Sequence, residues 1–289
     1  MEEDRIDTIY EKLQTLRQWD TVSVFSQALY ELIAERLTAQ GAAASGVTIA
    51  FADFLAAETN YHRRLAVLAQ RDQMQLSELQ ALAERRRFDL DAVADAIAHA
   101  AAGSRELRGI QHLLLAECYY HQRRSTEVVD QLRRAINCGI TDRLVQFALG
   151  YNVYTLALEQ FGALRGDKHE IHVTDQVAFQ EHCLSAIAVL EGSLGGDAFD
   201  AQVYWWLSHI MESAGMADAA RDVQDAMADT LGEGGSEVPD GGFPSEHDEA
   251  VAAPDYLPQI TASEVREAGE LLRGRFSLSE VLGHEPRDD

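Results

Sequence analysis

The distribution of proline limits what this chain can fold into more than any other feature. All five prolines lie at residue 239 or beyond, so residues 1–238 contain none. Proline in a helix interior removes a backbone hydrogen bond and clashes with the preceding turn, so a long proline-free stretch is typical of uninterrupted helices. The same stretch is rich in Ala, Leu, Gln, Glu and Arg, which favour helix. The sequence therefore predicts an all-α protein with roughly ten helices between residues 4 and 231.

Hydrophobic periodicity also indicates helices. One stripe with helical spacing contains Phe25, Leu29, Leu32, Ile33 and Leu37. No segment shows the alternation of a β-strand, and no Asn-Gly or Asp-Gly turn joins two strand-like runs. Short connections between helices predict that successive helices pack antiparallel. Glycines stand near the expected helix ends, at Gly41, Gly103, Gly139, Gly166 and Gly215.

The composition changes after Leu231. Residues 232–258 contain four of the prolines and no Lys or Arg, so we expect a disordered acidic linker over residues 232–260. Thr261 to Glu264 then has the spacing of a capping box and opens an amphipathic tail helix, within residues 261–289. The apolar side chains expected to make the contacts of this tail are Val265, Leu271, Leu272, Phe276, Leu278, Val281 and Leu282.

Charge and cysteine usage bear on partners and compartment. The formal net charge of −24 disfavours nucleic acid as the main ligand, because an acidic surface repels phosphates. No apolar run is long enough for a membrane span, and the acidic amino terminus lacks the pattern of a secretory signal. Three cysteines without a Cys-x-x-Cys pair indicate free thiols in a reducing compartment. We therefore expect a cytoplasmic protein, with a nuclear location left open.

A pair of one large and one small residue recurs in the second half of the chain. The pairs are Leu115-Ala116, Leu149-Gly150 and Leu207-Ser208, and the first two are 34 residues apart. A turn follows the first pair at Arg123-Arg124 and the third pair at Gly215. An apolar helix follows each turn, with Val128, Leu132 and Ala135 in one case and Ala220 and Met227 in the other. The small residues would let neighbouring helices approach closely.

This pattern resembles the tetratricopeptide repeat (TPR) family over roughly residues 110–231, as three repeats. The resemblance implies a right-handed solenoid of helical pairs over residues 106–231. No repeat ends in the family's usual proline, and Val128 and Gln224 stand where Ala and an aromatic residue are typical. An insertion around Gly166 to Asp175 stretches the middle repeat. Another α-solenoid or a helical bundle would give a similar pattern, and residues 1–105 are either degenerate repeats or a capping or dimerising bundle.

The resemblance also implies a partner-binding groove, lined by the first helix of each pair. The side chains expected there are Glu117, Tyr120, His121, Phe147, Tyr151, Tyr154, Trp205, His209 and Glu212. Such a surface is aromatic and has almost no positive charge, so it suits a helical or apolar segment of another protein. The competing interpretation is that Tyr151, Tyr154 and Trp205 are core residues, because aromatic side chains at helical spacing are commonly buried.

Residues that could bind a metal occur in two places. His169, His172 and His182 are close in sequence, but their spacing is not that of a His-Glu-x-x-His metalloprotease, and a polar insertion loop is the preferred interpretation. Glu58 with His62, and Glu117 with His121, form two Glu-x-x-x-His pairs that could be compared with a di-iron bundle. Di-iron sites use Glu-x-x-His, so an ordinary i, i+4 contact is preferred here. We expect no metal, no cofactor and no catalytic residue.

The sequence predicts a non-enzymatic adaptor or assembly subunit that binds other proteins and that could form homo-oligomers. The tail helix would act as a hook for a partner, as a helix docked on its own or a neighbouring chain, or without consequence. Two alternatives remain open at this point. One is a structural subunit of a larger multiprotein machine, and the other is a metal-dependent helical-bundle enzyme.

Overall fold

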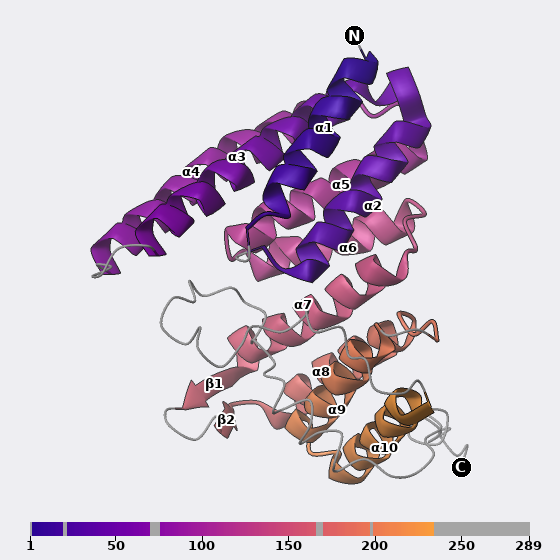
Figure 1. Ribbon diagram of the computed structural model, residues 1–289. Helices are drawn as coiled ribbons and strands as arrows, with labels where there is room; N and C mark the ends of the chain where they lie inside the picture. Colours follow the sequence, from indigo (N-terminus) through magenta and orange to yellow (C-terminus); the bar gives the residue numbers. More distant parts are fainter. Residues whose placement is uncertain (1, 20–21, 70–75, 166–169, 197–198, 234–289) are drawn as a thin grey trace. The chain divides into compact units, whose positions relative to one another are not determined.

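The computed structural model describes residues 2–19, 22–69, 76–165, 170–196 and 199–233, which are helical apart from one β-hairpin and the connecting segments (Figure 1). The predicted tail helix and all but the first two residues of the predicted linker lie outside these ranges. Within them, no helix has the length and apolar character that crossing a membrane requires. The chain forms two compact units, Met1–Ala148 and Leu149–Asp289, which are described separately.

In its described residues, the first unit consists of six helices, the 3-10 turn η1 and the start of a seventh helix (Figure 1). Helix α3 packs against α1 and α4, and α5 packs against α4 and α6. α3 and α4 form a long antiparallel hairpin. The elements are α1 (Glu2–Leu16), α2 (Val24–Gln40), the 3-10 turn η1 (Gly41–Ala44), α3 (Ser45–Ala69), α4 (Leu76–His99), α5 (Arg105–His121), α6 (Ser125–Asn137) and the start of α7 (Arg143–Phe161).

Local sequence determines where several of these helices begin. The Ser23 hydroxyl accepts a hydrogen bond from the backbone N–H of Ser26 at 3.1 Å, and Ser104 does the same for Leu107 at 3.0 Å. Both serines have extended backbone angles, which is the arrangement of an N-cap. Behind the cap of α2, Leu29, Ile33 and Leu37 are fully buried, as the helical stripe predicts.

The second unit contains the rest of α7, then β1 (Gly162–Arg165), β2 (Glu170–Val173), α8 (Gln176–Glu191), α9 (Asp200–Ser213) and α10 (Ala217–Glu233). β1 and β2 pair antiparallel, with Gly162 opposite Val173. The prediction of no strand is wrong here, because the insertion expected around Gly166 to Asp175 follows β1 and contains β2. Each strand is four residues long, too short to show a clear alternation in the sequence.

The predicted helical pairs are present at both ends of the repeat region. α5 pairs with α6, and α9 pairs with α10. The turns follow Arg123, Gly139 and Gly215, which all have positive φ (61°, 102° and 82°). In each turn the next residue donates a backbone hydrogen bond five residues back, as in a Schellman motif: Arg124 to Tyr119, Ile140 to Ala135 and Met216 to Met211. Arg123 thus occupies a position where glycine is usual.

The predicted small residue Gly150 allows close approach, and so does Gly109, which the sequence did not single out. A Cβ atom on Gly150 of α7 would lie 2.5 Å from Cγ of Leu190 and 3.1 Å from the backbone oxygen of Ala186, both on α8. A Cβ on Gly109 of α5 would lie 2.6 Å from Cγ1 of Ile140. A larger side chain at either position would force its neighbours to shift, chiefly the side chain of Leu190 in one case and that of Ile140 in the other.

The division between the compact units differs from the expected boundary near residue 105. α5 and α6, expected to open the repeat domain, belong to the same unit as α1 to α4. One ion pair ties α5 to α2, where Arg36 pairs with Glu106 at 3.0 Å, and Arg36 also pairs with Asp142, just before α7, at 2.7 Å. Helix α4 also packs directly on α5.

Candidate functional site

The structure buries several of the side chains that were expected to line a groove. Phe147, Tyr151, Tyr154 and Glu117 are all less than 9% exposed, and the side chain of His121 is 6% exposed. The expectation of an open groove is wrong for these residues, which belong to the interior. The competing interpretation is therefore confirmed for Tyr151 and Tyr154. Sequence periodicity placed them on the inner side of their helix, but it could not tell a groove from a packed core.

The remaining predicted groove residues are more accessible. Tyr120, Trp205 and His209 are partly buried, and Glu212 is exposed. The rings of Trp205 and His209 stack with centroids 5.1 Å apart and an angle of 11° between their planes. Beneath them, the fully buried Trp206 packs edge-on against Tyr151 at 4.9 Å. Trp205 and His209 thus form a partly exposed aromatic pair on α9, over an aromatic core.

The other candidate residues are only partly covered by the structure. The tail residues Val265, Leu271, Leu272, Phe276, Leu278, Val281 and Leu282 lie outside the described ranges, as does His169. His182 lies on α8, where its Nδ1 is 2.9 Å from the backbone oxygen of Ala178. Among the described residues, no three His, Cys, Asp or Glu side chains are placed to hold a metal ion.

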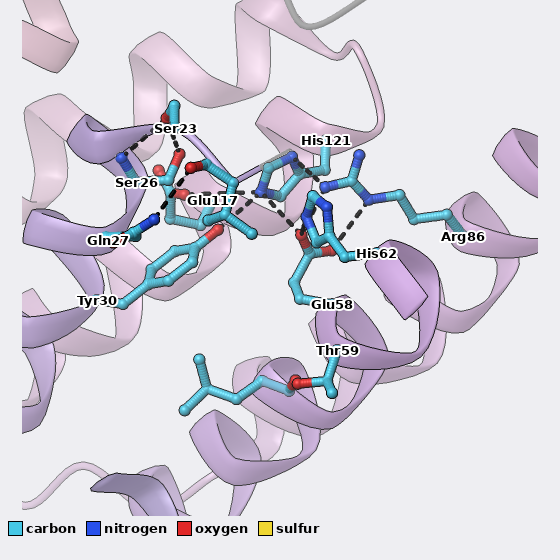
Figure 2. A network of polar contacts seen from close by, with 12 residues as sticks. Ser23, Ser26, Gln27, Tyr30, Glu58, Thr59, His62, Arg86, Glu117 and His121 are labelled. Atoms are coloured by element: carbon cyan, nitrogen blue, oxygen red, sulfur yellow. Dashed lines mark hydrogen bonds and ion pairs between the residues drawn. The ribbon is translucent and has the colours of Figure 1, made fainter. Parts of the chain in front are cut away.

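A buried polar network in the first unit joins four helices (Figure 2). Tyr30 comes from α2, Glu58 and His62 from α3, Arg86 from α4, and Glu117 and His121 from α5. These side chains are at most 11% exposed. The predicted i, i+4 contacts are present, with His62 Nε2 3.6 Å from Glu58 Oε2 and His121 Nε2 3.8 Å from Glu117 Oε2. The network unites both Glu-x-x-x-His pairs, which the sequence had suggested only as separate local contacts.

Arg86 is the cation at the centre of this network. Its Nε donates to Glu58 Oε1 at 3.0 Å and its Nη2 donates to Glu58 Oε2 at 2.5 Å, a bidentate pair. The guanidinium also lies over the ring of Tyr61, with Cζ 4.0 Å from the ring centroid. Because Arg86 engages both oxygens of Glu58, this carboxylate is already neutralised by a residue of its own chain.

The contacts of His121 determine its protonation state. Arg86 Nη2 is 2.9 Å from Nδ1 of His121, and a guanidinium can only donate hydrogen bonds. Nδ1 must therefore be the accepting nitrogen, so His121 is neutral and carries its hydrogen on Nε2. Figure 2 shows the imidazole between Arg86 and Tyr30, whose hydroxyl is 3.0 Å from Nε2. Burial and the nearby charge of Arg86 lower the pKa of His121 to about 3, in agreement with this tautomer.

Tyr30 continues the chain of hydrogen bonds to Glu117. Its oxygen accepts from Nε2–H of His121, which leaves its own hydrogen for Glu117, to which it is hydrogen-bonded. The donors therefore run in one direction, from Arg86 through His121 and Tyr30 to the carboxyl of Glu117. Bonds in such a chain polarise one another, so the state of the last member affects all of them.

The two carboxyl groups of the network have opposite electrostatic environments. Burial alone would raise the pKa of Glu58, but the charge of Arg86 and the hydrogen bonds from His62 and Arg86 hold it well below its usual range. Burial and the negative charge of Glu58 raise the pKa of Glu117 to about 8. At pH 7 the network therefore contains the carboxylate of Glu58, paired with the guanidinium of Arg86, and the neutral carboxylic acid of Glu117.

The sequence contained a partial signal for this network. Glu58 and His62 interrupt an otherwise apolar face of their helix, and a charged residue on such a face needs a buried partner. That partner, Arg86, belongs to an arginine triplet that could equally be a solvated face. Nothing in the sequence indicated that Tyr30 belongs to this network. The convergence of residues up to 91 positions apart was not predictable without the helix packing.

Comparison with protein-family models, with curated proteins and with solved structures gives no match for this chain. Its functional interpretation therefore depends on its own geometry.

Proposed function

We propose that this protein is a non-enzymatic binding protein, an adaptor or assembly subunit that uses TPR-like helical pairs to recognise other proteins. Two helical hairpins, α5/α6 and α9/α10, support this proposal because they share the same type of turn. The close approach at Gly150 also fits the family's use of a small residue between successive helices. The TPR identity itself remains part of the proposal.

The observation that carries the proposal is the aromatic pair formed by Trp205 and His209. Aromatic side chains dominate the binding energy of protein interfaces, and Trp is among the most enriched residues at their centres. The pair stacks on the first helix of its hairpin, partly exposed, above a closed core. Glu212, one turn on from His209, is exposed and accepts a hydrogen bond from Gln224 at 3.1 Å. Such a surface suits a helical or apolar segment with a polar edge.

The test is affinity purification of the full chain from its native cell, with quantitative mass spectrometry of the bound proteins. Trp205→Ala should reduce the recovery of the main partner at least tenfold, which corresponds to about 1.4 kcal/mol or more. Phe88→Ala is the matched control, because Phe88 is a 66% exposed aromatic in the other compact unit. Equal recovery with both variants would show that α9 is not the recognition surface.

A second comparison separates the helical pairs from the tail. A chain that ends at Leu231 retains the described helices almost completely. If it still recovers the partner, the helical pairs carry recognition. If the partner is lost with the truncated chain and retained with Trp205→Ala, the tail is the hook and the proposal that α9 is the recognition surface fails. A chain that is aggregated without its partner would instead favour the structural subunit of a larger machine.

A further inference from the structure

Glu117 is a buried titratable group that the proposed binding function does not use. It faces titratable or charged side chains from each helix of the network: Tyr30 from α2, Glu58 from α3, Arg86 from α4, and Cys118 and His121 on its own helix. His62 from α3 lies next to Glu58, with its Nε2 3.6 Å from Oε2. The α3–α4 hairpin is tied to α5 through these contacts. In particular, Arg86 reaches His121 on α5 at 2.9 Å, and Arg87 donates to the backbone oxygen of Gln122 at 3.2 Å.

The charge balance of the network depends on one proton. While Glu117 is neutral, the single carboxylate of Glu58 is matched by the single guanidinium of Arg86. When Glu117 loses its proton, two buried carboxylates face one guanidinium, and the carboxylate of Glu117 is left away from water without a guanidinium of its own. An uncompensated buried charge is costly, and the network can lower this cost by separating its helices and admitting water.

We propose that Glu117 is a proton-controlled latch: its neutral carboxyl keeps the α3–α4 hairpin packed on α5, and its ionisation loosens that packing. The latch would be closed in mildly acidic surroundings and would open as the pH rises. It adds a form of regulation that is independent of which partner the helical pairs bind.

Linkage gives the direction and the pH range of the effect. The pKa of Glu117 is raised to about 8 in the closed state, whereas an open state exposes the carboxyl to water and returns it toward 4.5. Because the pKa of Glu117 is higher in the closed state than in the open state, its proton stabilises the closed state. This stabilisation is complete below the pKa of the open state and is lost as the pH rises through the pKa of the closed state. The equilibrium constant for opening should therefore increase about tenfold per pH unit up to pH 7.5 and level off above pH 8.

Cys118 provides a direct probe of opening. It is a free thiol, fully buried, on the residue next to Glu117. Alkylation of Cys118 by iodoacetamide, measured on the native full chain by peptide mass spectrometry, requires its helix to be uncovered. The control is Glu117→Gln, which keeps the shape of the neutral acid and cannot ionise. Comparison of the two proteins at each pH removes the pH dependence that the thiol has without Glu117. The negative charge of Glu117 raises the pKa of the Cys118 thiol and so acts against the expected increase in rate.

The expected result is that the Cys118 alkylation rate of the native protein, divided by that of Glu117→Gln, rises about 50-fold from pH 6 to pH 8. Cys183, a buried free thiol of the second unit, should show a ratio that stays constant. A Cys118 ratio that does not change with pH overturns the latch. A parallel rise at Cys183 also overturns it, because the opening would then be general unfolding.

Tyr30→Phe is a second variant for the case in which Glu117→Gln does not fold. The hydrogen bond from Tyr30 lowers the pKa of Glu117, so its loss should raise that pKa further. The rate of Cys118 alkylation in Tyr30→Phe, relative to the native protein at each pH, should then rise above pH 8, because the native latch has levelled off there while opening of the variant still increases with pH. An unchanged profile in this variant contradicts the latch independently.

Discussion

The guanidinium of Arg86 on α4 and the carboxylate of Glu58 on α3 form a buried bidentate ion pair, with hydrogen bonds of 3.0 and 2.5 Å. Glu58 is 1% exposed, so neither charge can rely on water if the other is removed. The pair also sets the position of the guanidinium that contacts His121 on α5. It therefore connects the long α3–α4 hairpin to the rest of the first unit.

Removal of one member of this pair should destabilise the first unit strongly. Glu58→Leu leaves Arg86 charged and unpaired, which typically costs about 3–5 kcal/mol of unfolding free energy. The measurement is denaturant unfolding, followed by hydrogen exchange of α3 and α4 peptides. Glu127→Leu is the control: its pair with Arg124 is exposed, and such pairs contribute at most about 1 kcal/mol.

The double variant Glu58→Leu/Arg86→Met tests whether the cost comes from the unpaired charge. Replacement of both partners by apolar residues leaves no buried charge, so this protein should be more stable than Glu58→Leu alone. If the double variant is as unstable as the sum of the two single variants, the pair is not the origin of the effect. The loss would then reflect packing of the side chains.

The dependence of stability on pH should have two opposite limbs. Burial lowers the pKa of His121 to about 3, so the neutral imidazole stabilises the folded state. This contribution is complete above pH 6.5 and is lost as the pH falls toward 3. The raised pKa of Glu117 acts in the opposite direction, and its stability is lost between pH 4.5 and 8 as the pH rises. The two effects cancel between about pH 4.5 and 6.5, where the first unit should be most stable.

Glu117→Gln separates these limbs. It should abolish the alkaline limb and leave the acidic limb unchanged. The difference in unfolding free energy between this variant and the native protein should therefore change by about 1.4 kcal/mol per pH unit from pH 5 to 7.5. Thermal or denaturant unfolding across this pH range, at constant salt, measures it. A constant difference would mean that Glu117 is already ionised in the folded protein at pH 5.

The close approach of α7 and α8 at Gly150 gives a steric prediction. A Cβ atom there would lie 2.5 Å from Cγ of Leu190, so Gly150→Ala should destabilise the second unit by about 1–3 kcal/mol. Gly46→Ala on α3 is the matched control, because its Cβ would meet nothing closer than 3.5 Å and alanine favours helix. Leu190→Ala should partly relieve the clash, so the double variant Gly150→Ala/Leu190→Ala should lose less than the sum of the two single variants.

Local sequence signals predicted the parts of this structure that depend on neighbouring residues. The turn at Arg123-Arg124, the glycine turns at Gly139 and Gly215, and the small residue at Gly150 depend on backbone conformation or on one adjacent helix. The β1–β2 hairpin was missed because its strands are too short for a periodic signal. The convergence of Tyr30, Glu58, Arg86 and Glu117 was missed because it depends on the packing of four helices, and local periodicity contains no such information.

The burial of Tyr154 changes what its substitution is expected to do. A side chain in an open groove, one of the two interpretations of the sequence, could be truncated without loss of stability. In the structure Tyr154 is 1% exposed, packs against Trp206 and Phe179, and is 2.8 Å from the hydroxyl oxygen of Ser213. Tyr154→Ala should therefore leave a cavity and destabilise the second unit by about 3–5 kcal/mol.

Two further variants show whether this loss comes from packing or from the hydroxyl group. Tyr154→Phe keeps the ring and removes the hydrogen bond to Ser213 and the longer contact, 3.4 Å, to Nε2 of His209, so it should cost about 1 kcal/mol. Trp205→Ala, on the partly exposed ring nearby, should cost less than Tyr154→Ala while it weakens partner binding. Circular dichroism and denaturant unfolding measure the stability of all three proteins. If Tyr154→Ala is as stable as the native protein and binds its partner less well, Tyr154 lines a groove after all, and the aromatic core of the second unit must be able to open.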